Sequence, residues 1–346
     1  MKLLICTQAV DRNDPILGFF HEWITEFAGH FEHVHVICLR EGSHTLPKNV
    51  TVYSLGKESG ESRIKYIFRF YRFFGKVFFH DRVDFVFFHM GAVYNLLAIP
   101  FFVVRKLFGT SFYWWKAHGQ INIVGRIAGI FNDRIYTASA NSFRIPSKKK
   151  FVVGHGIAVE GETLKDKEIQ SHLRIVTVGR ITQVKNLERV VEVAHTLHTR
   201  NIPFTISVIG PVIQPAYFEE VQKLIARYDL QDFITFTGPK DASALAGIYE
   251  GADILLHPSK TGSIDKVVLE AMSHGVVPIA PQDAYAEILE SFHLCVEKDE
   301  SREYVAVMST LRDLKSDAYN ELRHNLQNEV VVKHSLATLP HRIFNV

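Results

Sequence analysis

Short runs of apolar residues alternate along the chain with longer runs in which apolar and polar residues mix at helical spacing. The short runs are rich in β-branched and aromatic residues, which is typical of buried strands, whereas the longer runs suit amphipathic helices. The predicted strands are residues 3–7, 33–39, 51–54, 84–89, 111–115, 134–138 and 151–153, followed by 173–178, 205–209, 233–237, 254–257 and 277–280. The main predicted helices are residues 19–28, 62–79, 93–108, 186–199, 216–228, 242–249 and 265–274.

This alternation predicts an α/β fold in which helices cover both faces of parallel sheets. The series restarts after a polar stretch at residues 158–171, and 346 residues are enough for two domains. We therefore expect two doubly wound, Rossmann-like domains, residues 1–157 and 158–330, with 331–346 as a helical segment that packs back on the first domain. Ligands of such sheets bind where the strands end, so we expect a ligand site in a cleft between the domains.

Composition narrows the class of protein. Hydrophobic residues make up 47% of the chain, which is typical of a globular protein, and the net charge of +2 argues against a dedicated nucleic-acid binder. Cys6, Cys38 and Cys295 form no CxxC pair and are expected to be buried thiols in a reducing compartment. No apolar run approaches the ~20 residues of a membrane span, and the first apolar run is too short for a secretory signal. A cytoplasmic location is expected.

The first chemical motif follows the strand at 173–178. Gly179 permits a tight turn, and Arg180 and Lys185 bring two cations to the start of the next helix, where backbone N–H groups also attract anions. This combination suits a diphosphate, although a solvated surface turn carries the same residue types. Gly210 ends the next strand in a similar glycine turn, which is weak evidence by itself.

The most informative segment is residues 257–280, HPSKTGSIDKVVLEAMSHGVVPIA. Ser263 and Asp265 are good N-cap residues for the helix that follows, and the loop N–H groups can hold phosphate. Glu270 lies further along this helix, where a carboxylate could accept hydrogen bonds from a ribose. A capped surface helix with a solvated glutamate is the structural alternative, but the neighbours of Glu270 are mostly apolar.

Gly179-Arg180 with Lys185, and Leu269-Glu270-Ala271-Met272 with Gly275, resemble two motifs of the retaining GT-B glycosyltransferases of family 4, also called group 1. The resemblance implies the GT-B fold, with two Rossmann-like domains, and a metal-independent transfer that retains the anomeric configuration. It implies no cofactor, since a nucleotide sugar serves as co-substrate. The donor site that it implies comprises Gly179, Arg180, Lys185, Gly210, Ser263, Lys266, Val267 and Glu270, with Arg180 and Lys185 at the diphosphate and Glu270 at the ribose.

One position departs from the family pattern. The usual glutamate that contacts the donor sugar is replaced by Gly262, in a TGSxDK form that resembles a variant of bacterial polysaccharide enzymes. Asp265 is therefore a candidate for the catalytic site, with Lys266 as another possible substitute for the glutamate.

The first domain matches the family more loosely. His118 follows the strand at 111–115, where the family places a histidine facing the donor sugar, so it is the second catalytic candidate; a strand-end histidine bonded to backbone is the alternative. His89 ends another strand and Gly18 lies after the first one, so both are candidates for lining the cleft on the acceptor side.

The stretch from Arg63 to His80 has a basic face beside an aromatic face and contains no acid. This is typical of an interfacial membrane helix and would suit a lipid-linked acceptor, with peripheral contact at the inner face of the plasma membrane. A core helix with a solvated basic side fits equally well. Single-stranded nucleic acid could also bind such a face, but no nucleic-acid module accompanies it.

The function predicted from the sequence is transfer of a hexosyl group from a nucleotide-diphosphate sugar to a hydroxyl of a glycan or lipid-linked acceptor. Surface polysaccharide or glycolipid assembly is the expected context. A sugar-nucleotide epimerase of the same fold and a non-catalytic nucleotide-sugar-binding protein are the alternatives. A nicotinamide dehydrogenase would need GxGxxG after the first strand, which the chain lacks.

Overall fold

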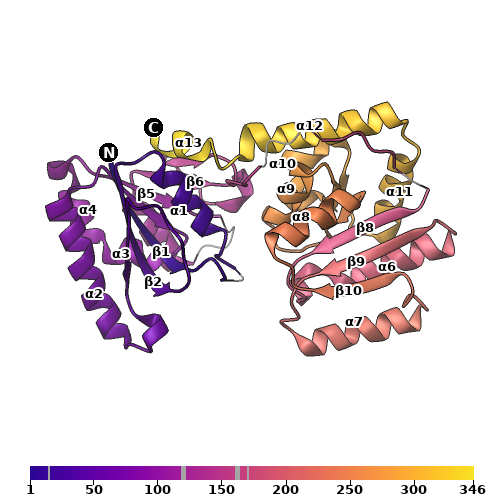
Figure 1. Cartoon of the computed structure of the whole chain (residues 1–346), viewed down its shortest axis with the longest axis horizontal. Helices are drawn as coiled ribbons and strands as arrows, with labels where there is room; N and C mark the ends of the chain where they lie inside the picture. The colour runs from indigo at the N-terminus through magenta and orange to yellow at the C-terminus, as the bar shows by residue number, and fades with distance from the viewer. Residues whose placement is uncertain (15, 118–121, 160–163, 170) are drawn as a thin grey trace. The chain divides into compact units, whose positions relative to one another are not determined.

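The computed structural model describes residues 1–14, 16–117, 122–159, 164–169 and 171–346. The chain forms two compact units, Met1–Ala158 together with Ser335–Val346, and Val159–His334. Each contains one parallel sheet with helices on its faces, so the predicted pair of Rossmann-like domains is confirmed (Figure 1). The sequence placed the last boundary at 330/331, whereas helix α12 (Ser316–His334) continues to residue 334 within the second unit.

The first sheet has seven strands in the order β3-β2-β1-β4-β5-β6-β7, and all neighbours pair in parallel. The sequence placed all seven, although β1 is longer than expected at both ends. Their bounds are β1 Lys2–Val10, β2 His33–Glu41, β3 Val50–Ser54, β4 Phe85–His89, β5 Ser111–Trp115, β6 Arg134–Thr137 and β7 Lys150–Val152.

Helices cover both faces of this sheet. On one face, α1 (Phe20–Ala28) and α13 (Leu339–Phe344) pack over a shared core. The other face is covered by α2 (Arg63–Lys76), α3 (Ala92–Leu97), α4 (Ile99–Val104) and α5 (Ile123–Ile130). Figure 1 shows α2 and α4 on the side of the sheet away from α1.

The single helix predicted at 93–108 is wrong. The chain instead forms α3, α4 and a 3-10 turn η3 (Arg105–Phe108), with the first break at Ala98. Pro100 follows directly at the start of α4 and has no N–H to donate, so a continuous helix would lose a hydrogen bond and meet the proline ring. Helix α2 likewise ends at Lys76, and a π turn, η2 (Val77–Asp81), completes the predicted segment.

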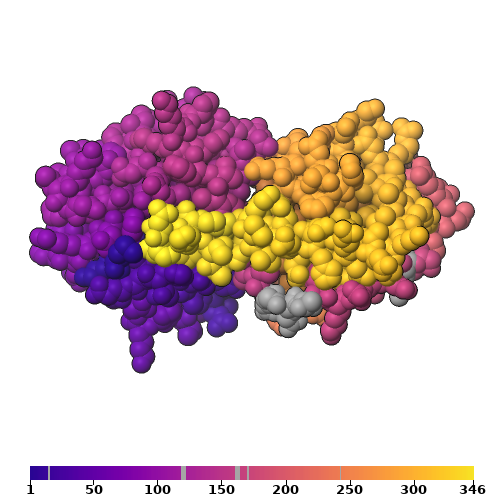
Figure 2. Space-filling model, turned by 90° about the horizontal axis from the view of Figure 1, so that it is seen from above, coloured from indigo at the N-terminus to yellow at the C-terminus, as the bar shows by residue number. Residues whose placement is uncertain are grey.

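The C-terminal segment completes the core of the first unit. Phe344 is buried, and its ring packs edge-on against Phe27 and Phe31. The hydroxyl of Tyr136 donates to the carbonyl of Ile343 at 2.6 Å, which ties α13 to β6. Figure 2 shows the yellow C-terminal residues on the surface of the first unit, beside its indigo N-terminal elements.

The second sheet has six parallel strands in the order β10-β9-β8-β11-β12-β13. The sequence placed all but β13, which is only two residues long. The strands are β8 Leu173–Val178, β9 Phe204–Ile209, β10 Ile234–Gly238, β11 Ile254–Leu256, β12 Val277–Pro281 and β13 Cys295–Val296. The helices are α6 Leu187–Thr199, α7 Pro215–Arg227, α8 Ala242–Gly251, α9 Lys266–Ser273, α10 Gln282–Leu289, α11 Ser301–Arg312 and α12.

A buried carboxylate joins the start of the second unit to its sheet. Asp253 is fully buried before β11 and accepts hydrogen bonds from the backbone N–H and the guanidinium of Arg174. The ammonium of Lys167 lies 3.2 Å from the same carboxylate. Two cations and a backbone donor thus offset the cost of burying this charge, and they fix residues 164–169 against the second sheet.

Within the described ranges, no helix combines the length and the apolar character needed to cross a membrane. Cys6 and Cys38 are buried thiols in β1 and β2, and Cys295 is a half-buried thiol in β13. Burial raises the pKa of Cys6 and of Cys38 well above the ordinary value, so neither thiol is poised to react.

We predict that Phe344→Ala lowers the free energy of unfolding of the first unit by about 3 kcal/mol, because it leaves a cavity among buried rings. Urea unfolding followed by tryptophan fluorescence measures this, since all 3 tryptophans (Trp23, Trp114 and Trp115) lie in the first unit. The control is Val332→Ala on α12, where the side chain is 61% exposed and a change below about 0.5 kcal/mol is expected. Equal midpoints for both variants would show that α13 is not part of this core.

Candidate donor site at the edge of the second sheet

The candidate site is the edge of the second sheet at which its strands end. Gly179, Gly210 and Gly238 close β8, β9 and β10 with φ of 148°, 144° and 70°, values that favour glycine. The N–H of Gly179 donates to the carbonyl of Ile209 at 2.9 Å, and that of Gly210 donates to the carbonyl of Gly238 at 3.0 Å. A Cβ on Gly210 would lie 2.0 Å from the carbonyl oxygen of Gly179. At Gly210 the two loops are therefore packed too closely for a side chain, whereas at Gly238 only the left-handed φ favours glycine.

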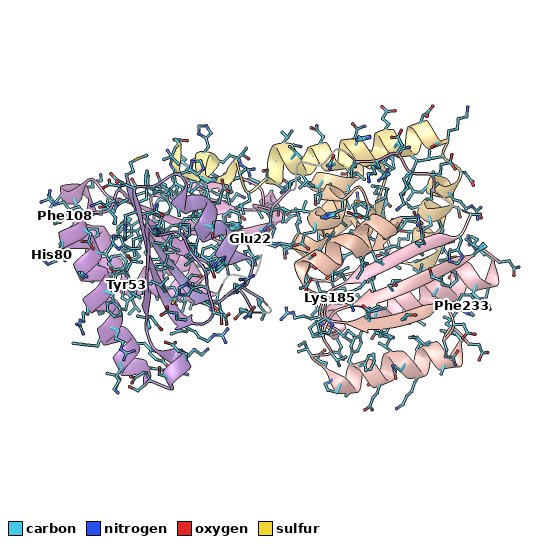
Figure 3. The ribbon with its side chains drawn as sticks, viewed as in Figure 1. Glu22, Tyr53, His80, Phe108, Lys185 and Phe233 are labelled. Carbon is cyan, nitrogen blue, oxygen red and sulfur yellow. The ribbon has the colours of Figure 1, made fainter. Side chains whose placement is uncertain are left out.

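Lys185 is held at this edge by contacts on two sides. Its stem passes over Gly179, where an added Cβ would lie 3.0 Å from Cε. Its ammonium lies 2.6 Å from Oδ2 of Asp265, and the lysine side chain is 16% exposed. Figure 3 places Lys185 at the end of the sheet where the strands terminate, and Phe233 at the opposite end. Arg180, in the same loop as Gly179, is exposed.

Asp265 joins three parts of the second unit. Besides Lys185, its Oδ2 accepts a hydrogen bond from Nε2 of His257 at 2.9 Å, and its backbone N–H donates to the hydroxyl of Tyr285 at 3.1 Å. The sequence predicted that Asp265 caps α9 with its side chain. Asp265 does precede α9, but its side chain makes no cap hydrogen bond, because the carboxylate turns towards the lysine and the histidine.

The charges of this cluster balance. Burial alone would raise the pKa of the Asp265 carboxyl, but the hydrogen bonds and positive charge of His257 and Lys185 outweigh it, and this pKa falls well below its usual range. Burial lowers the pKa of His257, and the hydrogen bond to Asp265 opposes this shift without reversing it. Asp265 is therefore a carboxylate, and it forms an ion pair with Lys185 at 2.6 Å.

The residues predicted on α9 and its loop lie beside this cluster in the chain. Ser263 is buried, and its carbonyl accepts from the hydroxyl of Thr261 at 3.1 Å. Lys266 and Val267 form the first turn of α9, Glu270 follows in the next turn, and all three are half-buried. The first turn of the helix directs N–H groups towards the loop, where an anion can bind.

Gly262, which replaces the family's glutamate, has φ of 64°. Side chains with a Cβ are strained in this left-handed conformation, so the loop is built for glycine. A glutamate at position 262 would therefore be strained in this loop, so the backbone as well as the side chain departs from the family pattern.

Of the candidate residues in the first unit, Gly18 lies in a turn and His89 is buried. Gly18 closes a turn over its own loop, where a Cβ would lie 2.7 Å from the carbonyl oxygen of Asp14. His89 is 1% exposed, stacks on Phe20 at 3.8 Å between ring centroids and lies 3.2 Å from the hydroxyl of Thr7. The structure thus places His89 in the core beneath α1, and its role on the acceptor side stays a prediction. His118 lies outside the described residues.

The sequence did not point to several residues that hold the loops of the candidate site together. Asn186 adopts φ of 54° and donates from Nδ2 to the carbonyl of Pro258 at 3.2 Å, which joins the two loops that carry Lys185 and Asp265. His257 ends a predicted strand and Asn186 follows Lys185 directly, so both carried a positional signal. Tyr285 carried none, because it contacts Asp265 only through the fold. No group of three or more His, Cys, Asp or Glu side chains that could hold a metal occurs among the described residues.

Known proteins are similar to this chain in sequence, mainly over the second unit. Residues 162–330 match the family described as "Glycosyl transferases group 1", so the second unit carries the sequence pattern of that family. A provisionally named colanic acid biosynthesis glycosyltransferase, WcaL, of Escherichia coli (strain K12) is 24% identical over 184 residues, 48% of this chain and 44% of that protein. The amylovoran biosynthesis glycosyltransferase AmsK of Erwinia amylovora is 28% identical over 144 residues, 40% of this chain and 35% of that protein. The chain thus spans less than half the length of these curated relatives.

Solved structures match over the whole chain. HepE of Anabaena, crystallised with UDP and glucose, is similar with a TM-score of 0.72 and 13% identity over 100% of this chain and 98% of that one. WaaG, a glycosyltransferase involved in lipopolysaccharide biosynthesis, is similar with a TM-score of 0.65 and 13% identity over 99% and 100% of the two chains. The expected GT-B fold is confirmed by these neighbours.

We predict that Gly210→Ala lowers the free energy of unfolding of the second unit by about 2 kcal/mol or more, because its Cβ would displace the backbone of Gly179 at a strained φ. The matched control is Gly247→Ala in the middle of α8, where an added Cβ meets nothing within 4 Å. That change is expected to stabilise by up to ~1 kcal/mol, as helical glycine to alanine does. Thermal unfolding followed by circular dichroism separates the two, and equal effects would contradict the close packing of the loops.

Proposed function

We propose that this protein is a glycosyltransferase that moves a hexosyl group from a nucleotide-diphosphate sugar to a hydroxyl of a glycan or lipid-linked acceptor. The observation that carries the proposal is the loop edge that brings Arg180, Lys185 and the first turn of α9 to the same end of the second sheet. A diphosphate needs fixed cations and N–H donors, and this edge offers both. The family match of residues 162–330 and the UDP bound by the structural neighbour HepE support the same ligand class.

In this proposal the protein acts mainly through electrostatics. Arg180, Lys185 and the N–H groups of α9 stabilise the negative charge that develops on the leaving nucleoside diphosphate. Glu270 binds the ribose, and the transfer is retaining and metal-independent, as the family resemblance implies. His118 is assigned to the donor sugar on the resemblance alone.

Asp265 receives a more specific role. Its Oδ2 accepts from both Lys185 and His257, so we assign it the positioning of the lysine rather than direct contact with the sugar. The diphosphate is a stronger anion that can bind through two oxygens. When it binds, it replaces part of the pairing between Lys185 and Asp265. A fixed lysine loses little freedom when the donor binds, which favours a pre-organised site.

Surface polysaccharide assembly is the proposed context, because the relatives WcaL and AmsK are named for colanic acid and amylovoran biosynthesis. An epimerase of the same fold would convert the nucleotide sugar without an acceptor, and a non-catalytic protein would bind it unchanged. Incubation with a panel of UDP, GDP and ADP sugars, with and without oligosaccharide or lipid-linked acceptors, separates the three. Acceptor-dependent release of the diphosphate is the expected result, whereas release or conversion that ignores the acceptor would refute the transferase.

We predict that Lys185→Met weakens the binding of the matching nucleoside diphosphate by about 10- to 100-fold, the loss expected for a hydrogen bond to a charged group. Isothermal titration calorimetry with UDP, GDP and ADP measures this. Lys223→Met on α7 is the control, since Lys223 is an exposed surface lysine and its loss should leave the affinity unchanged. An affinity that survives Lys185→Met would remove the lysine from the donor site.

We also propose that the first unit contacts an anionic membrane surface through α2. The structure revises the expected helix in two respects. Lys65 and Arg69 both pair with Glu61, so half of the expected basic face is neutralised within the protein. Ile64 is 80% exposed and Phe68 is 70% exposed, although the sequence allowed a core helix to bury them.

Other helices on the same face of the first sheet also carry exposed apolar side chains. Val103 in α4, Leu107 in η3 and Ile123 in α5 are 70%, 83% and 73% exposed. These helices cover the same face of the first sheet as α2, and Figure 3 shows His80 and Phe108 close together at one end of that face. A face that carries both exposed apolar side chains and cations is typical of a surface that rests on a bilayer.

We predict that the double variant Ile64→Ser/Phe68→Ser reduces binding to phosphatidylglycerol-containing vesicles at least ~10-fold, because each buried apolar side chain contributes roughly 1.5–3 kcal/mol. Co-sedimentation at two salt concentrations measures the apolar and the charge contributions separately. Val332→Ser, a 61% exposed valine of α12, should bind as the parent protein does. A parent protein that ignores anionic vesicles would exclude membrane contact through this face.

A further inference from the structure

The first unit has a cavity of its own at the edge where its central strands end. The cavity has a volume of about 760 Å³ and is lined from β1, from the turn between β4 and α3, from β5 and from the start of α5. Its polar lining groups are Gln8, Lys116 and Asn122, and Trp114 forms an apolar wall. This volume is in the range of small-molecule sites, and a few polar groups on an apolar wall are their usual lining.

Gln8 breaks the pattern of the strand that carries it. β1 is buried on both faces at the centre of the sheet, yet Gln8 is exposed while its neighbours Thr7 and Ala9 are buried. A polar residue in a central strand is costly unless it faces water or a ligand. Its amide is therefore available to whatever occupies the cavity.

The rim of the cavity is conformationally strained. Met90 directly follows β4 with φ of 62°, a left-handed conformation that is uncommon for a residue with a side chain. The turn is held by the N–H of Met90, which donates to the carbonyl of Trp115 at 2.9 Å, and by the N–H of Ala117, which donates to the sulfur of Met90 at 3.4 Å. Strain of this kind persists where a site requires a fixed backbone.

Lys116 is the decisive residue of the cavity. It is half-buried, and burial lowers the pKa of its ammonium, so it has lost part of its hydration. Among the residues that the structure describes, no carboxylate pairs with it. The sequence contains no Asp or Glu at all between residues 85 and 132, so residues 118–121 supply none either. A partly buried cation without an internal counter-ion favours an anionic ligand.

Asn122 adds a second amide to the polar lining. It caps α5 by accepting the N–H of Gly125 at its Oδ1, at 2.9 Å, which leaves its amide NH₂ as a donor. Trp114, which forms the apolar wall, is fully buried.

We propose that this cavity binds the acceptor, and that the acceptor is a sugar carrying an anionic substituent, a carboxylate or a phosphate, paired with Lys116. The inference rests on the proposed transferase function and names the substrate class of its acceptor side. Lys116 binds the anionic group, while the amides of Gln8 and Asn122 take hydroxyls. A neutral sugar leaves the half-buried ammonium unpaired and binds more weakly.

The test is ligand-observed NMR on the full chain with glucuronic acid, glucose 1-phosphate and glucose, each with and without saturating UDP. We expect at least one of the two anionic probes to bind about tenfold more tightly than glucose, the gain typical of a charge-assisted hydrogen bond. Preference for glucuronic acid identifies a carboxylate, and preference for glucose 1-phosphate identifies a phosphate. Equal binding of all three probes, or no binding of any, overturns the proposal.

Lys116→Gln is expected to abolish the preference for the anionic probe, and to leave both the affinity for UDP and the binding of glucose unchanged. The control is Lys106→Gln, a cationic residue of η3 that does not line the cavity. A preference that survives Lys116→Gln overturns the assignment. Displacement of the probe by UDP also overturns it, and would indicate that the cavity is a phosphate site for the donor.

If UDP binds but the anionic preference is absent, only this inference fails. If the anionic preference is present but no diphosphate is released to any acceptor, the proposed function fails instead.

Discussion

Both candidate sites depend on one constraint, which is that all the strands of each sheet run in the same direction. Parallel strands end at a common edge, and every loop that leaves them must pass there. In the second unit this edge collects Gly179, Gly210 and the loop before α9. In the first unit it collects Gln8, the turn at Met90, and Lys116. Residues far apart in the sequence become neighbours through strand direction alone, before any side chain contributes.

The lysines at the two sheet edges differ in whether a carboxylate pairs with them. At the second edge, Lys185 is paired with Asp265 and the carboxylate is shared with His257, so the lysine is fixed and neutralised in the same contact. At the first edge, Lys116 is half-buried without a described carboxylate beside it. A paired cation costs little to hold in place but must exchange one anion for another, whereas an unpaired cation is costly until its ligand arrives. The first arrangement favours pre-organisation, and the second favours selectivity for charge.

The sequence predicted the fold well because the strands carry a strong local signal. Runs such as Leu173–Val178 and Ser111–Trp115 were placed at their observed bounds, since a buried parallel strand is continuously apolar. The prediction of a single helix at 93–108 is wrong because it rested on the helical spacing of apolar residues. Pro100 interrupts the backbone hydrogen bonds of such a helix. β13 was missed because two residues cannot establish a pattern.

The sequence pointed to candidate residues for the donor site but not to their contacts. Gly179, Arg180, Lys185 and Asp265 are candidates from their motifs and the family resemblance, yet the pairing of Lys185 with Asp265 spans 80 positions of sequence and follows only from the meeting of two loops. The burial of His89 could not be predicted, because it depends on α1 covering the end of this strand. No motif marked Lys116 in the sequence. Its significance depends on the absence of acidic residues around it in the folded chain.

The first unit is assembled from two pieces of chain, since residues 335–346 return to it after the whole second unit. On the ribosome, therefore, all seven strands of the first sheet are made early, but the core on one face of the sheet stays incomplete until α13 is made. The rings of Phe27 and Phe31 remain open to water until Phe344 has been synthesised, after every residue of the second unit. The second unit, being continuous, can fold as soon as it emerges. Order of synthesis and order of completion are thus reversed for the two units.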